Sequence, residues 1–157
     1  MRTTLIKSLA AVAIATVAAF GADSSVGTWK LNTDKSTYTP APMPVKSLTS
    51  TRVGSDGGVT VTSKGERTDG TVISTSYTAK YDGTAVPVKG YGAPYDTLAL
   101  KRVDANTYTD ERKKTGGQYH ATGRTTISED GKLMTWRSSG TGADGKPFTS
   151  TFVYDKQ

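Results

Sequence analysis

The chain has 157 residues, no cysteine, one histidine and a formal net charge of +6. Without cysteine and with a single histidine it forms no disulfide and cannot assemble the usual zinc, copper or iron ligand sets. Its lysines and arginines are scattered among acidic residues, so the basic stripe typical of nucleic-acid-binding domains is missing. We therefore expect no cofactor, no metal and no nucleic-acid partner.

The N-terminal segment has the features of a secretory signal peptide. A basic start precedes an apolar run over residues 9–20, and small residues follow. This order is typical of an export signal, and the run is short for a membrane span. We assign residues 1–22 to a signal peptide cleaved after Gly21 or Ala22, and expect the mature protein in the periplasm or outside the cell without stable membrane insertion. An uncleaved membrane anchor is the alternative.

Residues 23–157 have the length of one domain with its own core. Apolar residues recur at every second position, and Thr, Ser, Val and Tyr are abundant, as in β-strands. Asp-Gly pairs, which tolerate the positive φ of tight hairpin turns, separate the segments. The strands predicted between these turns are 28–33, 47–54, 58–67, 71–81, 84–89, 96–103, 107–114, 118–128, 132–141 and 147–155.

The connections predict how these strands are arranged. They are short except at the proline-rich "YTPAPMP" and at "GYGAP", which favours antiparallel neighbours. About ten antiparallel strands in one small domain accumulate twist and would expose two edges if they stayed open. We therefore predict an all-β fold, an up-and-down barrel or a two-layer clam, in which the last strand pairs with the first.

The predicted strand faces mix aromatic and hydroxyl side chains, and the chain has only three Phe and two Trp. Either the barrel is partly hollow with an amphipathic lining, or its core is thin. A connected void of at least ~300 Å³ would decide for ligand binding. The candidate ligand-binding residues are Tyr77, Tyr81, Leu98, Leu100, Arg102, Tyr119, Trp136 and Phe152.

Arginines inside predicted strands are the groups best able to orient a ligand. A guanidinium in a dry barrel is stabilised when it meets a carboxylate, which makes an acidic amphiphile a natural partner. Arg102 shares a face with Leu98, which favours the interior; the alternative is an exposed arginine that braces its strand. Arg124 shares a face with His120, which favours the exterior, and the side of Arg137 is ambiguous.

The densest charge cluster is "DERKK", residues Asp110–Lys114. We interpret it as a solvated hairpin end, because charges near strand ends discourage edge-to-edge pairing, with a polyanion site as the alternative. His120 alternates with the polar Gln118 and Thr122 and is expected to face solvent, so a nucleophile would lack its usual base. We therefore predict no catalytic residues and no enzyme.

A tryptophan motif opens the first predicted strand. Gly27-x-Trp29 resembles the G-x-W signature of lipocalins and fatty-acid-binding barrels, in which the Trp plugs one end. With "GTWKLNTDKSTYTPAP", "SEDGKLMTW", "GTGADGKPF" and the ending "FVYDKQ", the mature chain resembles small exported bacterial proteins described as lipocalin-like, a calycin-type family. The resemblance implies a single barrel domain over residues 23–157, with Gly27 and Trp29 in structural roles.

The chain departs from both classical families. Where lipocalins carry T-D-Y it has Thr109-Asp110-Glu111, and where they place an arginine against the Trp it has Lys156. The helical lid of fatty-acid-binding barrels cannot form from the proline-rich 36–44, and their R-x-Y carboxylate clamp is absent. The ligand class of those families is therefore not carried over.

Two functions remain open from the sequence. The first is a monomeric, non-enzymatic binding protein for a small apolar or amphipathic molecule. The alternative is an envelope-structural or protein-interaction module with a filled barrel, acting through exposed tyrosines of the loop "KGYGAPYD", Tyr91 and Tyr95.

Overall fold

The computed structural model describes residues 22–157, so the predicted signal peptide, apart from its last residue, lies outside the described residues. The described part consists of β-strands joined by turns, and no helix in it is long and apolar enough to cross a membrane. The strands are β1 (Gly27–Thr39), β2 (Val45–Ser55), β3 (Gly58–Arg67), β4 (Val72–Lys80), β5 (Asp82–Pro87), β6 (Lys89–Tyr91), β7 (Thr97–Arg102), β8 (Thr107–Lys113), β9 (His120–Ile127), β10 (Leu133–Thr141) and β11 (Pro147–Lys156).

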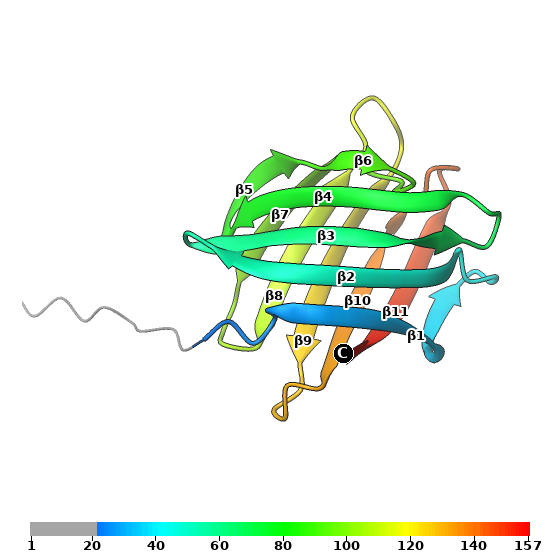
Figure 1. Ribbon diagram of the computed structural model, residues 1–157. Coiled ribbons are helices and arrows are strands. Elements are labelled where there is room, and N and C mark those ends of the chain that lie inside the picture. Colours follow the sequence, from blue (N-terminus) through cyan, green and yellow to red (C-terminus); the bar gives the residue numbers. More distant parts are fainter. Residues whose placement is uncertain (1–21) are drawn as a thin grey trace, which may run out of the picture.

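All the strands belong to one 11-stranded antiparallel sheet, in the order β5-β7-β8-β9-β10-β11-β1-β2-β3-β4-β6. The last strand lies beside the first, with Trp29 opposite Lys156 and Leu31 opposite Tyr154. The sheet curls into a nearly closed barrel (Figure 1). The all-β antiparallel barrel predicted from the sequence is confirmed. Closing the sheet on itself protects the backbone groups of its two edge strands, which an open sheet would leave unpaired.

The two edges of the sheet meet along the segment 82–91, where the sequence predicts a single strand over 84–89. The structure divides this stretch, because β5 pairs with β7 whereas β6 pairs with β4. The chain changes partner at Val88, whose N–H donates to the carbonyl of Asp96 at 2.8 Å. β4 and β5 are therefore consecutive in the chain but are not neighbours in the sheet.

The core follows from strand alternation, which sends every second side chain inward. Most of these inward residues are aliphatic or aromatic, and they form the core of the barrel. The main buried cluster contains Trp29, Leu31, Val45, Val59, Val61, Ile73, Ala79, Leu98, Leu100, Tyr108, Ile127, Met134, Trp136, Phe152 and Tyr154. A second, smaller cluster contains Tyr119, Ala121 and Phe148.

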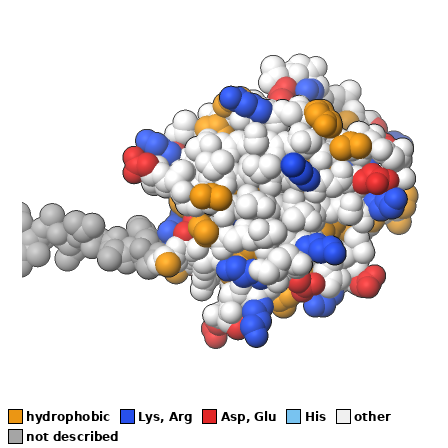
Figure 2. Space-filling view, viewed as in Figure 1, with side chains coloured by type: hydrophobic (Ala, Val, Ile, Leu, Met, Phe, Trp, Pro, Cys, Tyr) orange, Lys and Arg blue, Asp and Glu red, His pale blue; other side chains and the backbone are white. Residues whose placement is uncertain are grey.

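The outer surface carries charges of both signs, and its hydrophobic side chains are scattered singly on the face that Figure 2 shows. Scattered apolar side chains are normal on a protein surface. Arg124 and His120 are exposed, as the sequence predicts, and Arg137 is exposed as well. His120 Nε2 lies 2.9 Å from Glu111 Oε1 on this outer side.

One end of the barrel is closed by Trp29, which is fully buried at 0% exposure. Its Nε1–H donates to the carbonyl of Ser25 at 2.8 Å, and Lys156 Nζ lies 5.1 Å from the centre of its ring. Gly27 has φ +133°, and a Cβ there would lie 2.8 Å from Lys156 Cε. The glycine of the G-x-W motif therefore leaves room for the lysine that covers the tryptophan, where lipocalins place an arginine.

The residues before β1 seal the same end. Asp23 Oδ1 accepts hydrogen bonds from the Tyr108 hydroxyl at 2.6 Å and from the N–H of Ser25 at 2.9 Å, and Oδ2 accepts one from the Tyr81 hydroxyl. Burial alone would raise the pKa of Asp23, but the bonds donated by Tyr108, Tyr81 and Ser25 outweigh it and lower that pKa. We call Asp23, Ser25, Tyr81 and Tyr108 the floor cluster.

Candidate functional site

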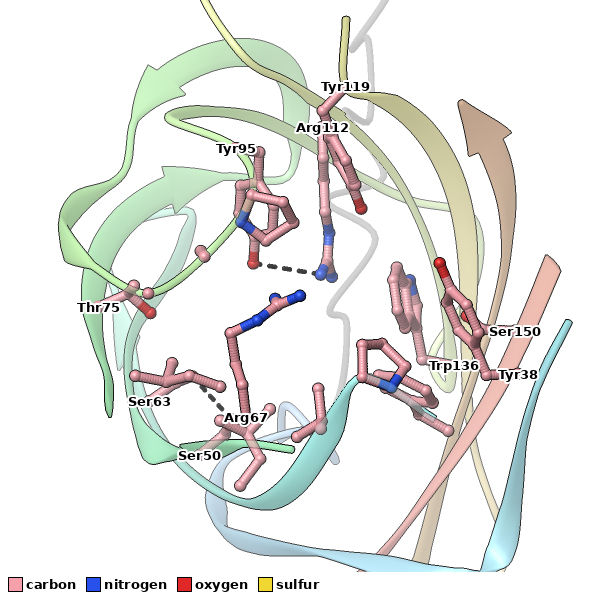
Figure 3. A pocket seen from close by; sticks show the side chains of 18 of the residues that line it. Tyr38, Ser50, Ser63, Arg67, Thr75, Tyr95, Arg112, Tyr119, Trp136 and Ser150 are labelled. Carbon is pink, nitrogen blue, oxygen red and sulfur yellow. Dashed lines mark hydrogen bonds between the residues drawn. The ribbon is translucent and has the colours of Figure 1, made fainter. Parts of the chain in front are cut away.

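A cavity of about 410 Å³ occupies the barrel toward the end opposite the floor cluster (Figure 3). Its lower walls are inward faces of β2, β3, β4 and β8 to β11, and its rim includes Pro44 and the loop residues 92–95 and 142–144. The volume lies above the lower end, about 300 Å³, of the usual range of small-molecule pockets. The link between β1 and β2, where fatty-acid-binding barrels have a helical lid, contains no helix.

An aromatic ladder lines one wall of the cavity. Tyr38 stacks on Phe148 with ring centroids 5.5 Å apart, Phe148 on Tyr119 at 5.9 Å, and Tyr119 on Tyr95 at 5.9 Å. These separations are those of favourable aromatic pairs. Burial raises the pKa of Tyr119, so its hydroxyl is protonated at neutral pH. The aromatic ladder thus gives the cavity a broad apolar surface with polar edges.

Hydroxyl groups lie beside the aromatic ladder and on the walls across from it. Ser50 Oγ and Ser63 Oγ are 2.7 Å apart, and Ser150 Oγ is 2.8 Å from Ser138 Oγ. Thr75 of β4 also lines the cavity, on the wall that Figure 3 shows across from Trp136. The amphipathic lining expected from the strand faces is therefore present.

Arg112 of β8 reaches into the cavity from the rim side (Figure 3). Its Nε donates to Asp110 Oδ2 at 2.7 Å, its Nη1 donates to the Tyr95 hydroxyl at 3.2 Å, and its guanidinium carbon lies 4.0 Å from the centre of the Trp136 ring. Burial alone would lower the pKa of Arg112, but the Asp110 carboxylate outweighs burial and raises it. The arginine is therefore a fixed charge.

Gly123 of β9 makes this arrangement possible. Trp136 Nε1 donates to Asp110 Oδ1 at 2.8 Å, and the indole crosses directly over the backbone of Gly123. A Cβ at this position would lie 2.2 Å from Trp136 Nε1 and 2.7 Å from Asp110 Oδ1. The missing side chain therefore lets the tryptophan and the carboxylate meet.

Two further arginines line the cavity. Arg52 of β2 is 8% exposed, forms no ion pair with residues 22–157, and has an Nε without a hydrogen-bond partner there. Arg67, at the end of β3, is 27% exposed in its side chain, and its Nε lies 3.9 Å from Asp69 Oδ2. Figure 3 shows Arg67 pointing into the cavity toward Arg112. The lining thus carries an excess of positive charge.

Four of the eight candidate residues line the cavity, namely Tyr77, Tyr119, Trp136 and Phe152. Tyr77, Trp136 and Phe152 come from β4, β10 and β11, and Tyr119 immediately precedes β9. Strand alternation predicted that they face inward. Their role in ligand binding stays a prediction.

The other four candidates, Tyr81, Leu98, Leu100 and Arg102, are not among the lining residues. Leu98 and Leu100 are buried in the solid core, and Tyr81 belongs to the floor cluster. Arg102 donates to the carbonyls of Asp104 at 3.1 Å and Ala105 at 3.2 Å, and its guanidinium carbon lies 5.7 Å from the ring centres of Tyr81 and Tyr108. Alternation predicts which side chains face inward but not how deep along the barrel they lie.

The interpretation of Asp110–Lys114 as a solvated hairpin end is wrong for its two inward-facing members. The side chains of Asp110 and Arg112 are 2% and 18% exposed, whereas the two lysines at the end of the segment are 55% and 50% exposed. Alternation with the buried Tyr108 was the signal that could have separated these two sets. Arg52 and Arg67 lie in the predicted strands 47–54 and 58–67 but were not among the arginines considered, and strand alternation could have flagged them in the same way.

The comparisons with known proteins concern the fold. No protein-family model matches the chain, and no curated protein matches it. The zebrafish ileal bile acid-binding protein complexed with cholic acid matches with a TM-score of 0.50 and 11% identity, over 85% of this chain and 99% of that chain. This chain has the fold of that bile acid-binding barrel. A redesigned β-barrel, mFAP1, bound to DFHBI, matches with a TM-score of 0.39 and 19% identity, over 82% of this chain and 94% of that chain.

The alternative of a filled barrel required exposed tyrosines on the loop after β6 and no internal cavity. Tyr91 is 63% exposed, but Tyr95 points into the cavity and bonds to Arg112. The barrel is hollow near that loop, so the features on which the alternative depended are not found together.

Proposed function

We propose that this protein is an exported, lipocalin-like binding protein that takes one small apolar or amphipathic molecule into its barrel and carries out no reaction on it. The observation that carries the proposal is the cavity of about 410 Å³. This volume lies in the range of small-molecule sites, which are largely apolar with a few placed polar groups. The aromatic ladder and the cavity arginines match that description.

Fold and sequence support two parts of this proposal separately. A barrel of the same fold is complexed with cholic acid in the zebrafish protein, which makes an interior ligand reasonable without naming it. Export rests on the basic, apolar and small residues of 1–22, and the lipocalin-like assignment rests on Gly27 and Trp29. We propose a monomer that works in the periplasm or outside the cell.

A cavity-filling substitution tests the proposal. Thr75 lines the cavity and is 9% exposed, so Thr75→Trp puts an indole into the space that a ligand would use. We expect the wild-type protein to bind the uncharged dye Nile red with a rise in fluorescence, and Thr75→Trp to weaken that binding at least ~10-fold, since a filled pocket cannot take the dye.

The matched control is Thr62→Trp. Thr62 lies on the outer face of the neighbouring strand β3 and is exposed, so its substitution adds the same side chain outside the barrel. It should bind Nile red as the wild-type protein does. Equal binding by the wild-type protein and Thr75→Trp would place the dye outside the cavity and contradict the proposal.

A further inference from the structure

Three guanidinium groups line the cavity, and only one of them has a buried carboxylate partner. Arg112 is held by Asp110 at 2.7 Å. Arg67 lies 3.9 Å from the carboxylate of Asp69, which is 65% exposed and therefore shared with solvent. Arg52 has no carboxylate within ion-pair distance among residues 22–157. The lining also includes one carboxylate, the exposed Asp144 of the rim, but it forms no ion pair with Arg52. A buried cation without a partner is unfavourable, so Arg52 would be stabilised by an anion inside the cavity.

Hydrogen-bond donors from several strands line the cavity together with Arg52. Tyr77 of β4, Arg112 of β8 and Tyr154 of β11 are among its lining residues. Burial raises the pKa of Tyr77 and of Tyr154, so both phenols keep their protons well above neutral pH and can donate.

We propose that the molecule bound in the cavity is an anionic amphiphile, whose carboxylate or similar oxyanion accepts hydrogen bonds from Arg52, in a cavity whose positive charge Arg67 and Arg112 increase. This inference rests on the proposed function, because it assigns a chemical class to the ligand of the same cavity. It differs from the R-x-Y clamp of fatty-acid-binding barrels, which this chain lacks. Charge-assisted bonds from guanidinium groups to carboxylates are among the strongest in proteins.

The register of the strands gives the orientation of the ligand. Arg52 lies opposite Gly27 on β1 and Val61 on β3, toward the closed end, whereas Arg67 lies opposite Val45 at the rim. From Val61 to Arg67 the strand rises roughly 20 Å. The anionic group therefore binds on the inner side, and the apolar body extends toward the aromatic ladder, whose members lie at the rim ends of their strands or in a rim loop.

Matched pairs of competitors test the inference. Nile red bound to the wild-type protein is displaced at pH 7 with dodecanoate or 1-dodecanol, which share one chain, and with 2-naphthaleneacetate or its neutral amide, which share one ring system. We expect at least one carboxylate to displace the dye at least ~10-fold more effectively than its neutral partner. Arg52→Met should abolish this preference, while Arg52→Lys should retain part of it.

Arg137→Met is the control, because Arg137 is exposed on the outer face of β10 and its removal changes the net charge by the same amount. It should keep the preference of the wild-type protein. If no carboxylate outcompetes its neutral partner, or if the preference survives in Arg52→Met, the inference is overturned. Failure of Nile red to bind the wild-type protein at all would instead contradict the proposed function, so the two failures are distinguishable.

Discussion

Arg52 is the residue whose role can be tested without any ligand. Its side chain is 8% exposed and unpaired within residues 22–157, so in the empty barrel it opposes folding. We predict that Arg52→Met increases the free energy of unfolding of the ligand-free protein by about 1–3 kcal/mol, because methionine fills similar space without a charge. Urea denaturation of delipidated protein, monitored by tryptophan fluorescence, measures this change.

Arg137→Met serves again as the control, since removing an exposed arginine should change stability by less than about 0.5 kcal/mol. A loss of stability in Arg52→Met would mean that the guanidinium is compensated inside the protein. The rationale for an external anion would then disappear.

Residue identity alone could not reveal these arginines. Arg112 belongs to a run of charged residues, and such a run predicts exposure to solvent. In the structure it is largely buried, because it forms an ion pair with Asp110 and stacks on Trp136. Asp110 lies two residues before Arg112 on the same face of β8, whereas Trp136 is brought to it through the pairing of β8 with β9 and β9 with β10, and Gly123 leaves the space. Tyr119 and Phe152, by contrast, were predictable as inward-facing because alternation with apolar neighbours needs no tertiary knowledge.

At the scale of elements, the segment before β1 acts as part of the barrel floor. Asp23 accepts hydrogen bonds from Tyr81 and Tyr108, and these lower its pKa. A carboxyl with a lowered folded-state pKa stabilises the protein above its unfolded pKa, and this contribution is lost as the pH falls through the folded pKa. The stabilising effect of Asp23 should thus be complete near neutral pH and decline below about pH 4.

Asp23→Asn tests this effect, because the amide keeps an acceptor oxygen but cannot ionise. We predict that the wild-type protein is more stable than the variant by a constant amount between about pH 5 and pH 7, and that the gap narrows below about pH 4. Urea unfolding of both proteins across this pH series measures the gap. A gap that stays constant down to pH 3 would show that ionised Asp23 does not hold the floor cluster together.

Most elements were predictable because Asp-Gly turns and two-residue alternation are local signals. The pairs at 56–57, 69–70 and 130–131 separate consecutive paired strands, as the sequence predicts. The segment 82–91 was not predictable, because its partner change depends on which strands already flank the remaining gap. Local sequence specifies that a residue is extended, but not which of two edges it will join.

For the whole molecule, the barrel is closed but its interior is not filled by side chains along its whole length. The chain closes β1 on β11 and seals one end with Trp29 and the floor cluster, and it leaves the opposite part unfilled. The sequence predicted closure from strand number and edges, and it left open whether the barrel is hollow. The size of the cavity depends on how far along the barrel axis each inward side chain lies, and the alternation of residues along a strand does not predict that position.

On this proposal the cavity holds an anionic amphiphile with its charged group near Arg52. A crystal structure of the protein prepared with dodecanoate tests it most directly. We predict density for an acyl chain that runs from Arg52 toward the aromatic ladder, with a carboxylate oxygen within hydrogen-bond distance, about 2.7–3.2 Å, of an Arg52 nitrogen. A cavity holding only water, or a ligand whose carboxylate points out past the rim, would contradict the account.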